Sequence, residues 1–293
     1  MRVGIVIMLE GDATSAPRYR DLRALAQQAE AGGFDSIWLY DHLLFRSPER
    51  TLGQWECFPM LAALAEATER VEIGTLVACT AFRNPALLAK MADTIDEISD
   101  GRFTLGLGAG WNQAEFQAFG FPYDHRVDRF EEALQIIVPL LRDGRVDFTG
   151  TYERAPNCEL LPRGPRPHGP PIMIGAFGPR MLRIAARWAD SINTGFDLHE
   201  FAPGHTPVDD ACRDVGRDPV TLPLTFPGWV ACPDLGPTPD HMHDSQYRSA
   251  EEIAGYLRKN DQAGVDHVMI DFRPNNAAVL DRLVEALRLF RST

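Results

Sequence analysis

Residues 70–110 read RVEIGTLVACTAFRNPALLAKMADTIDEISDGRFTLGLGAG, and this stretch decides the fold class. An apolar run at Val71–Ala78 predicts a buried strand. Asn84–Pro85 is typical of a helix start, and the spacing of the apolar residues that follow predicts a helix to Ile98. A second apolar run, Phe103–Gly108, predicts the next strand. Strand, helix and strand in this order indicate a parallel sheet with helical crossovers.

The same alternation extends over nearly the whole chain. The apolar runs predict eight strands, at Arg2–Met8, Ser36–Tyr40, Val71–Ala78, Phe103–Gly108, Pro171–Gly175, Asp190–Thr194, Leu222–Ala231 and His267–Phe272. Helical spacing of apolar residues predicts eight helices, at Tyr19–Ala31, Phe58–Thr68, Pro85–Ile98, Arg126–Leu141, Met181–Trp188, Val208–Val215, Ala250–Ala263 and Ala277–Phe290. Eight such units in 293 residues favour the α/β class, and within it a closed (β/α)8 TIM barrel over an open sheet.

Three segments are longer than a bare barrel needs. Leu43–Cys57 follows the second predicted strand, Gly110–His125 follows the fourth, and Arg142–Pro170 precedes the fifth. The last of them contains VDFTGTYERA, which predicts a hairpin. Insertions of this length are often functional lids. Because no linker of interdomain character interrupts the pattern, we expect residues 1–293 to form a single barrel domain.

Composition excludes several classes of function. The 29 basic and 41 acidic residues give a net charge of −12 without a basic patch, which argues against binding to nucleic acid or to an anionic membrane. No stretch approaches the roughly 20 apolar residues of a membrane span. The five cysteines are scattered without a CxxC pair, so neither a disulfide framework nor a metal site is expected. The start of the chain lacks the features of a signal peptide, and we expect a cytoplasmic protein.

Candidate catalytic residues follow the second strand, where the sequence reads SIWLYDHLL. Active sites of barrels lie where strands end, so Asp41 and His42 are expected at the barrel mouth. His42 has the chemistry of a general acid or base near neutral pH, with Asp41 orienting it or contacting a ligand. The alternative is a structural histidine packed under a loop. Cys79, just past the third strand, is interpreted as an inert small hydrophobe rather than a nucleophile.

Two glycine-containing segments, a strand and a turn, are candidate ligand sites. Gly106 and Gly108 present bare backbone on one face of the fourth strand, which suits the close approach of a flat ring or a phosphate, or simply relieves crowding. The turn after the fifth strand leads into a helix near Pro179, and free N–H groups at a helix start attract anions. A turn without a ligand is the alternative there.

Other candidates are weaker. His241 and His243 lack a third metal ligand and are interpreted as solvated lid residues. Trp55, Trp111 and Trp229 lie near predicted strand ends, where they are expected to line an apolar pocket.

Several segments in a fixed order resemble the bacterial luciferase-like superfamily. They are GFDSIWLYDH at 33–42, the stretch 70–122, FTGTYE at 148–153 and PPIMIGAFGPRMLRIAARWADSINTGF at 170–196. Within the superfamily, the chain resembles the oxidoreductases that depend on the deazaflavin coenzyme F420. The resemblance covers residue 1 to about Phe196 and resumes weakly at GVDHVMIDF, 264–272.

The resemblance implies a luciferase-like barrel with the ring of the coenzyme at its mouth, beside Asp41 and His42. His42 is then the proton-transfer residue. The family often has a non-proline cis peptide after the third strand, which falls at Leu76–Val77 here and, with Ala78, supports the back of the ring. Contacts to the cofactor chain or its phosphate are implied for Gly108, Gly110, Trp111 and Asn112, and for a second turn formed by Gly175, Ala176, Phe177 and Gly178.

The implied reaction is a hydride transfer between F420 and a small organic substrate, which is apolar or mildly polar. The predicted mouth loops contain no lysine, which argues against a sugar phosphate. One alternative is an FMN-dependent monooxygenase of the same superfamily, with a flavin reductase supplying reduced FMN. Another is a flavin-binding barrel without catalysis. Members of this superfamily commonly form dimers, so a homodimer is expected.

Overall fold

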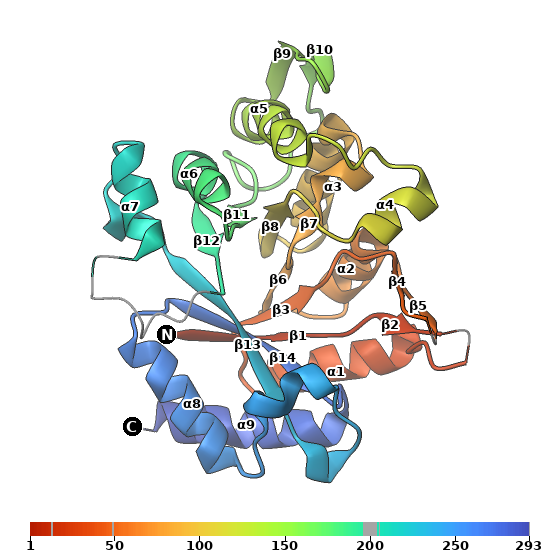
Figure 1. The fold of residues 1–293 in the computed structure, drawn as a ribbon, viewed down its shortest axis with the longest axis vertical. Helices are drawn as coiled ribbons and strands as arrows, with labels where there is room; N and C mark the ends of the chain where they lie inside the picture. Colours follow the sequence, from red (N-terminus) through yellow and green to blue (C-terminus); the bar gives the residue numbers. More distant parts are fainter. Residues whose placement is uncertain (13, 49, 196–203, 205, 293) are drawn as a thin grey trace.

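A closed ring of parallel strands forms the centre of the molecule (Figure 1). The computed structural model describes residues 1–12, 14–48, 50–195, 204 and 206–292. Its barrel strands are β1 (Arg2–Val6), β3 (Ser36–Leu39), β6 (Glu72–Thr75), β8 (Phe103–Gly108), β11 (Ile172–Gly175), β12 (Ser191–Asn193), β13 (Leu224–Ala231) and β14 (His267–Arg273). Each pairs in parallel with the next, β14 pairs with β1, and β11 pairs with β8. The predicted TIM barrel is therefore confirmed. Phe196, the last residue of the fourth quoted segment, lies outside the described residues.

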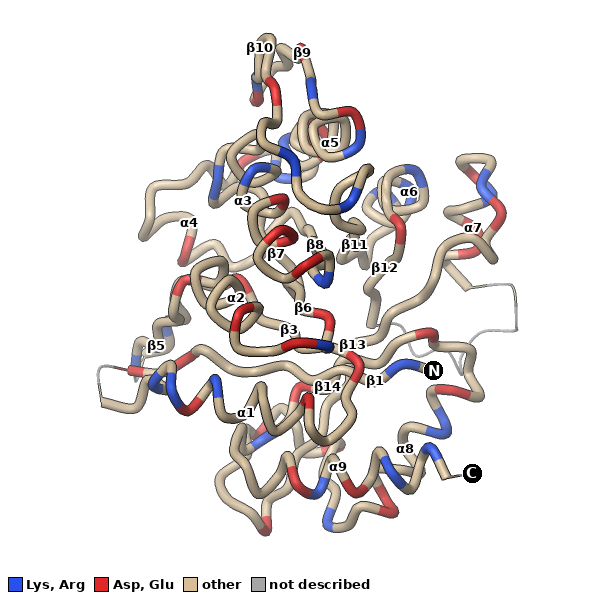
Figure 2. The backbone as a smooth tube through the Cα atoms, turned by 180° about the vertical axis from the view of Figure 1, so that it is seen from behind, with Lys and Arg blue, Asp and Glu red and all other residues tan. Residues whose placement is uncertain are grey.

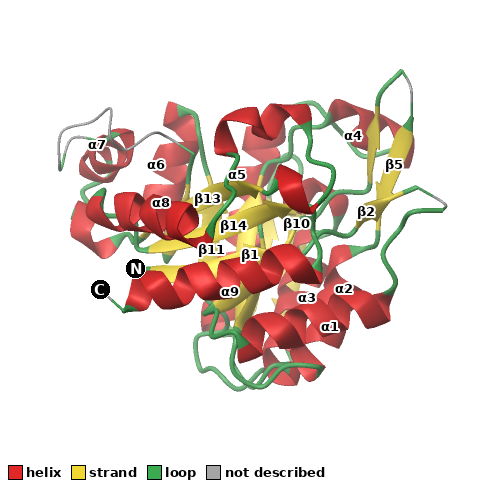
Figure 3. Cartoon of the chain, turned by 90° about the horizontal axis from the view of Figure 1, so that it is seen from below, coloured by secondary structure: helices red, strands yellow, loops and turns green. Residues whose placement is uncertain are grey.

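Helices surround this ring on the outside (Figures 1 and 3). They are α1 (Tyr19–Ala31), α2 (Cys57–Glu66), α3 (Pro85–Ile98), α5 (Arg126–Asp143), α6 (Pro179–Trp188), α7 (Pro207–Asp214), α8 (Ala250–Gln262) and α9 (Ala277–Arg291). Capping residues explain several of the starts. The Asn84 side chain accepts a hydrogen bond from the Leu87 N–H, and Ser249 forms a capping box with Glu252. The predicted bounds agree to within a few residues.

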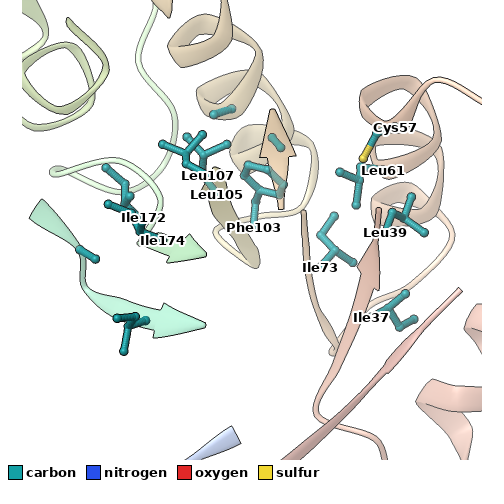
Figure 4. Close-up of a cluster of buried hydrophobic side chains, with 14 of the residues drawn as sticks. Ile37, Leu39, Cys57, Leu61, Ile73, Phe103, Leu105, Leu107, Ile172 and Ile174 are labelled. Carbon is teal, nitrogen blue, oxygen red and sulfur yellow. The ribbon is translucent and has the colours of Figure 1, made fainter. Parts of the chain in front are cut away.

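Alternation along the strands divides the apolar side chains between two cores. Side chains such as Ile37, Leu39 and Ile73 point outward and pack under the helices, as Figure 4 shows. Trp38, between Ile37 and Leu39, points into the barrel, where it packs with Met173 and four further residues: Val6, Met8, Leu76 and Met269. The interior below the mouth is thus filled by side chains and is not a pore.

A hydrogen-bonded cluster lies inside the barrel on β3 and β14. Trp38 Nε1 donates to Ser36 Oγ at 2.7 Å, and Ser36 Oγ lies 2.8 Å from His267 Nε2. Burial, followed by the charge of Arg2, lowers the pKa of His267 to about 3. The imidazole is therefore neutral in the folded protein near neutral pH.

The three predicted insertions all contain regular structure. After β3, β5 (Thr51–Gln54) pairs with both β4 (Leu44–Arg46) and β2 (Glu10–Gly11) in a small antiparallel sheet beside the mouth. After β8, the insertion contains a short helix, α4 (Gln113–Phe119), which the sequence did not indicate. Before β11, β9 (Arg145–Thr149) and β10 (Arg154–Glu159) form the predicted hairpin. Short 3-10 turns occupy Thr80–Phe82, Pro219–Thr221, Pro233–Leu235 and Asp240–Ser245.

The predicted third strand, Val71–Ala78, is wrong in one respect. The peptide bond between Leu76 and Val77 is cis, as the resemblance implies. The chain leaves the ladder after Thr75 and pairs with β8 again at β7 (Ala78–Cys79).

Charged residues of both signs are interspersed over the outer helices (Figure 2). In the described part of the chain, no helix has both the length and the apolar character needed to cross a membrane.

Candidate active site

A cavity of about 830 Å³ opens at the carboxyl ends of the barrel strands. Most of the predicted site residues line it: Asp41, His42, Leu76, Val77, Gly108, Gly110, Trp111, Gly175, Phe177 and Gly178. A smaller hollow, of about 450 Å³, lies at the other end of the barrel beside Met1, Arg2 and Asp261. We take the mouth cavity as the candidate site because barrel enzymes place their chemistry at this end.

His42 is held by a carboxylate that the sequence did not indicate. Its Nδ1 lies 2.8 Å from Oε1 of Glu115, which is on α4 and only 1% exposed. The other carboxylate oxygen of Glu115 accepts the backbone N–H groups of Leu43 and Leu44. Glu115 therefore fixes both the imidazole and the backbone that follows it.

The protonation state of this pair follows from its surroundings. Burial by itself would raise the pKa of Glu115, but the hydrogen bonds from His42, Leu43 and Leu44 outweigh it and lower that pKa overall. A carboxylate only accepts hydrogen bonds, so Nδ1 of His42 carries the hydrogen. The Nε2 atom is the nitrogen left to exchange a proton with a ligand.

Asp41 does not orient His42, contrary to one sequence interpretation. Its two oxygens accept hydrogen bonds from the Arg83 guanidinium at 2.7 and 2.8 Å, and one also accepts from the Cys79 N–H at 2.9 Å. Arg83 also pairs with Glu56. Burial by itself would lower the pKa of Arg83, but the hydrogen bonds to the carboxylates of Asp41 and Glu56 outweigh it and raise this pKa overall. Asp41 thus anchors the chain just after the cis peptide, although it also lines the cavity.

Aromatic rings surround the imidazole of His42. The ring centroid of Phe45 lies 4.5 Å from it, that of Trp111 5.6 Å and that of Tyr40 6.4 Å. Trp229 lines the same cavity, as predicted for it and for Trp111. Trp55 does not line the cavity, and that prediction is wrong: its Nε1 donates to the Pro17 carbonyl at 2.8 Å.

The glycines of β8 make room for protein rather than for a ligand. A Cβ at Gly106 would lie 2.0 Å from the Thr75 carbonyl oxygen, and one at Gly108 would lie 2.7 Å from Val77 Cγ2. Relief of crowding therefore explains both. The turn after β11 differs, since a Cβ at Gly178 would meet nothing within 4 Å and α6 has no side-chain cap.

Three predicted cofactor contacts do not line the cavity. Ala78 and Ala176 are buried in the protein. Asn112 instead donates from its side-chain amide to the Leu44 carbonyl at 3.0 Å, which ties α4 to β4. They support the wall rather than form its surface.

The other reactive side chains considered from the sequence are Cys79, His241 and His243. Burial, followed by the charge of Asp41, raises the pKa of Cys79 to about 12, in line with the inert interpretation. His241 and His243 are both exposed, as expected, and His241 also lines the cavity. The described residues contain no cluster of three groups able to hold a metal ion.

The fold is a (β/α)8 barrel with a cavity at its mouth, and comparison with known proteins identifies the family of such barrels to which it belongs. The model of the luciferase-like monooxygenase family matches residues 1–289, and the chain belongs to this family.

The curated relatives fall into two groups. The F420-dependent hydroxymycolic acid dehydrogenase of Mycobacterium tuberculosis is 34% identical over 233 residues, which cover 75% of this chain and 60% of the relative. The 5,10-methylenetetrahydromethanopterin reductase of Archaeoglobus fulgidus is 34% identical over 175 residues, or 60% of this chain and 49% of that protein. The pyrimidine monooxygenase RutA of Enterobacter cloacae is 30% identical over 242 residues, or 74% and 64%. The chain thus spans about half to two thirds of the curated relatives it matches.

Solved structures share the whole fold. An F420-dependent secondary alcohol dehydrogenase in complex with an F420–acetone adduct superposes with a TM-score of 0.82 at 22% identity, over 99% of both chains. A riboflavin lyase with modified FMN gives a TM-score of 0.80 at 15% identity, over 100% of this chain and 91% of the other.

Proposed function

We propose that this protein is an F420-dependent oxidoreductase that transfers a hydride between the deazaflavin coenzyme and a small organic substrate. The observation that carries the proposal is the His42–Glu115 pair, which leaves Nε2 of His42 available at an apolar cavity. A relative that depends on F420, 34% identical over 75% of this chain, supports the choice of coenzyme.

The described residues fit such a coenzyme. Leu76 and Val77 give the cavity an apolar wall where a flat ring can rest. The Gly178 turn is open and begins a helix whose first N–H groups have no side-chain cap, which suits a phosphate. Arg180 is not free to assist there, because it pairs with Asp128 and Glu131.

The residues around His42 perform the proton chemistry. Coenzyme F420, when bound, supplies the two-electron carrier that exchanges a hydride with the substrate carbon. Nε2 of His42 takes the proton of a hydroxyl group as that group becomes a carbonyl, and returns the proton in the reverse direction. Glu115 stabilises the imidazolium that forms, and Phe45 and Trp111 limit the access of water.

An FMN-dependent monooxygenase is the second candidate, favoured by the 30% identity with the pyrimidine monooxygenase RutA. In that case a flavin reductase would supply reduced FMN. A flavin-binding barrel without catalysis is the third candidate. We further propose that the protein is cytoplasmic and forms a homodimer. Each chain of this dimer is a single barrel domain that covers residues 1–293.

The test of His42 separates catalysis from binding. His42→Gln keeps a polar side chain of similar size but cannot accept a proton near neutral pH. We expect turnover to fall about 100-fold or more, with the dissociation constant of F420 within a few-fold of the parent. Equal turnover in both proteins would remove His42 from the mechanism. Absence of turnover in the parent protein with every alcohol and ketone tried would favour the binding barrel.

A further inference from the structure

The mouth cavity has a second polar wall, on the side of β14 and β1. Arg273 at the end of β14, Glu10 in β2 and Tyr40 after β3 line it, together with His241. In the strand order of the barrel, β14 lies across from β8. This wall therefore faces β8, which lies between β6 and β11, the strands followed by Leu76 and Val77 and by the Gly178 turn, where the coenzyme is proposed to bind.

Buried hydrogen bonds fix Arg273 in this wall. One terminal nitrogen, Nη1, donates to Oδ1 of Asp271 and to the Phe272 carbonyl at 3.1 Å. Asp271 is buried, and its other oxygen accepts the Tyr40 hydroxyl at 3.0 Å. A guanidinium held in this way is preorganised, so little side-chain entropy is lost when a ligand binds to it.

Hydrogen-bonding capacity remains unused at the same wall. Within the described part of the chain, neither Nε nor Nη2 of Arg273 has a hydrogen-bond acceptor. Nη2 lies 3.8 Å from Oε1 of Glu10, which is longer than a hydrogen bond. Gln54, the cross-strand neighbour of Glu10, has a side-chain amide with no partner among the described residues. Arg273 Nη2, a donor, and Glu10 Oε1, an acceptor, thus lie close together without forming a hydrogen bond with each other.

The charges of the wall decide which ligand it suits. Asp271 already neutralises Arg273, and Glu10 adds a negative charge beside it. An incoming carboxylate or phosphate would gain little from Arg273 and would be repelled by Glu10. A neutral group that accepts from Arg273 and donates to Glu10 satisfies both, and amides and alcohols are such groups.

We propose that Arg273 and Glu10 form a specificity subsite that binds a neutral amide or hydroxyl group of the substrate and rejects anionic groups. The proposal rests on the proposed function in one respect, namely that the rest of the same substrate reaches His42.

The subsite is testable without any coenzyme, with acetamide and sodium acetate as small matched probes. The ¹⁵N-labelled full-length chain is titrated at pH 8, where an ordinary imidazole is neutral, and the Arg273 Nε–H resonance is followed. The Arg273 Nε–H resonance is assigned as the one that disappears in Arg273→Lys. If that variant does not fold, the resonance is assigned from its change in Glu10→Gln. We expect acetamide to shift it at several-fold lower concentration than acetate.

The decisive variant is Glu10→Gln, which removes the repelling charge and keeps the shape. We expect acetate affinity to rise about fivefold or more in this variant, so that the preference for acetamide disappears or reverses. Glu72→Gln is the matched control, because Glu72 also pairs with an arginine, Arg2, and is similarly exposed, but lies at the other end of the barrel. It should behave as the parent does.

Three results would overturn the subsite: no shift with either probe, equal affinity for both probes in the parent, or the same preference in Glu10→Gln as in Glu72→Gln. Because F420 binding is measured separately, failure of the subsite is distinguishable from failure of the proposed function.

Discussion

The imidazole of His42 and the carboxylate of Glu115 form one pair, 2.8 Å apart at Nδ1 and Oε1, although 73 positions separate them in the chain. The pair exists because α4, in the insertion after β8, reaches back to the end of β3. Glu115 is a positioning residue, since it acts on the substrate only through the imidazole.

Glu115→Gln should lower kcat by about 10- to 100-fold, because the amide stabilises an imidazolium less well than a carboxylate does. It should also change the pH profile of activity, because the variant removes the ionisable group whose pKa is lowered in part by the hydrogen bond with His42. Steady-state kinetics over a pH series measure both effects, with Glu131→Gln on the surface of α5 as control. A lower rate with an unchanged pH profile would reduce Glu115 to a packing role.

Asp41→Asn should destabilise the fold by about 3 kcal/mol, because it weakens a buried ion pair and leaves the charge of Arg83 poorly compensated. Urea denaturation gives the free energy of unfolding. The control is Asp210→Asn, which breaks the exposed pair with Arg213 and should cost less than about 0.5 kcal/mol. Loss of activity without loss of stability in Asp41→Asn would mean that Asp41 acts on the ligand instead.

Gly178→Asp should stabilise the fold and weaken cofactor binding at once. Its Cβ has open space, and an aspartate caps α6, which adds about 0.3 kcal/mol of stability relative to glycine. The same carboxylate repels a phosphate, so the dissociation constant of F420 should rise about tenfold. Gly178→Ser caps the helix without charge and should bind F420 nearly as the parent does. Tight F420 binding by Gly178→Asp would place the phosphate elsewhere.

His267 should make the protein less stable in mild acid. Its pKa of about 3 in the folded state lies below the ordinary 6.5, so the unfolded chain binds a proton between these values and the folded protein does not. The contribution of His267 to the free energy of unfolding is fully present above pH 6.5. It falls by about 1.4 kcal/mol for each pH unit below that value. His267→Asn should flatten the slope of unfolding free energy against pH, whereas His168→Asn, at an exposed position, should keep it. Equal slopes in both variants would contradict this assignment.

The sequence predicted the barrel because each strand and helix has its own local pattern. His42 and Asp41 were placed at the mouth because barrel strands end there, and the cis peptide before Val77 came from the family resemblance. The role of Glu115 could not be predicted, because no local sequence pattern indicates which residue a carboxylate on a short helix in an insertion will contact. Trp55 was assigned to the wrong surface because proximity to a strand end does not fix the direction of a side chain.

The most direct test of the central claim is a fluorescence-quench titration of the purified protein with oxidised F420 and, separately, with FMN. We predict saturation at micromolar F420 and much weaker binding of FMN. Tighter binding of FMN would contradict the deazaflavin assignment and favour the monooxygenase, and binding of neither would contradict both.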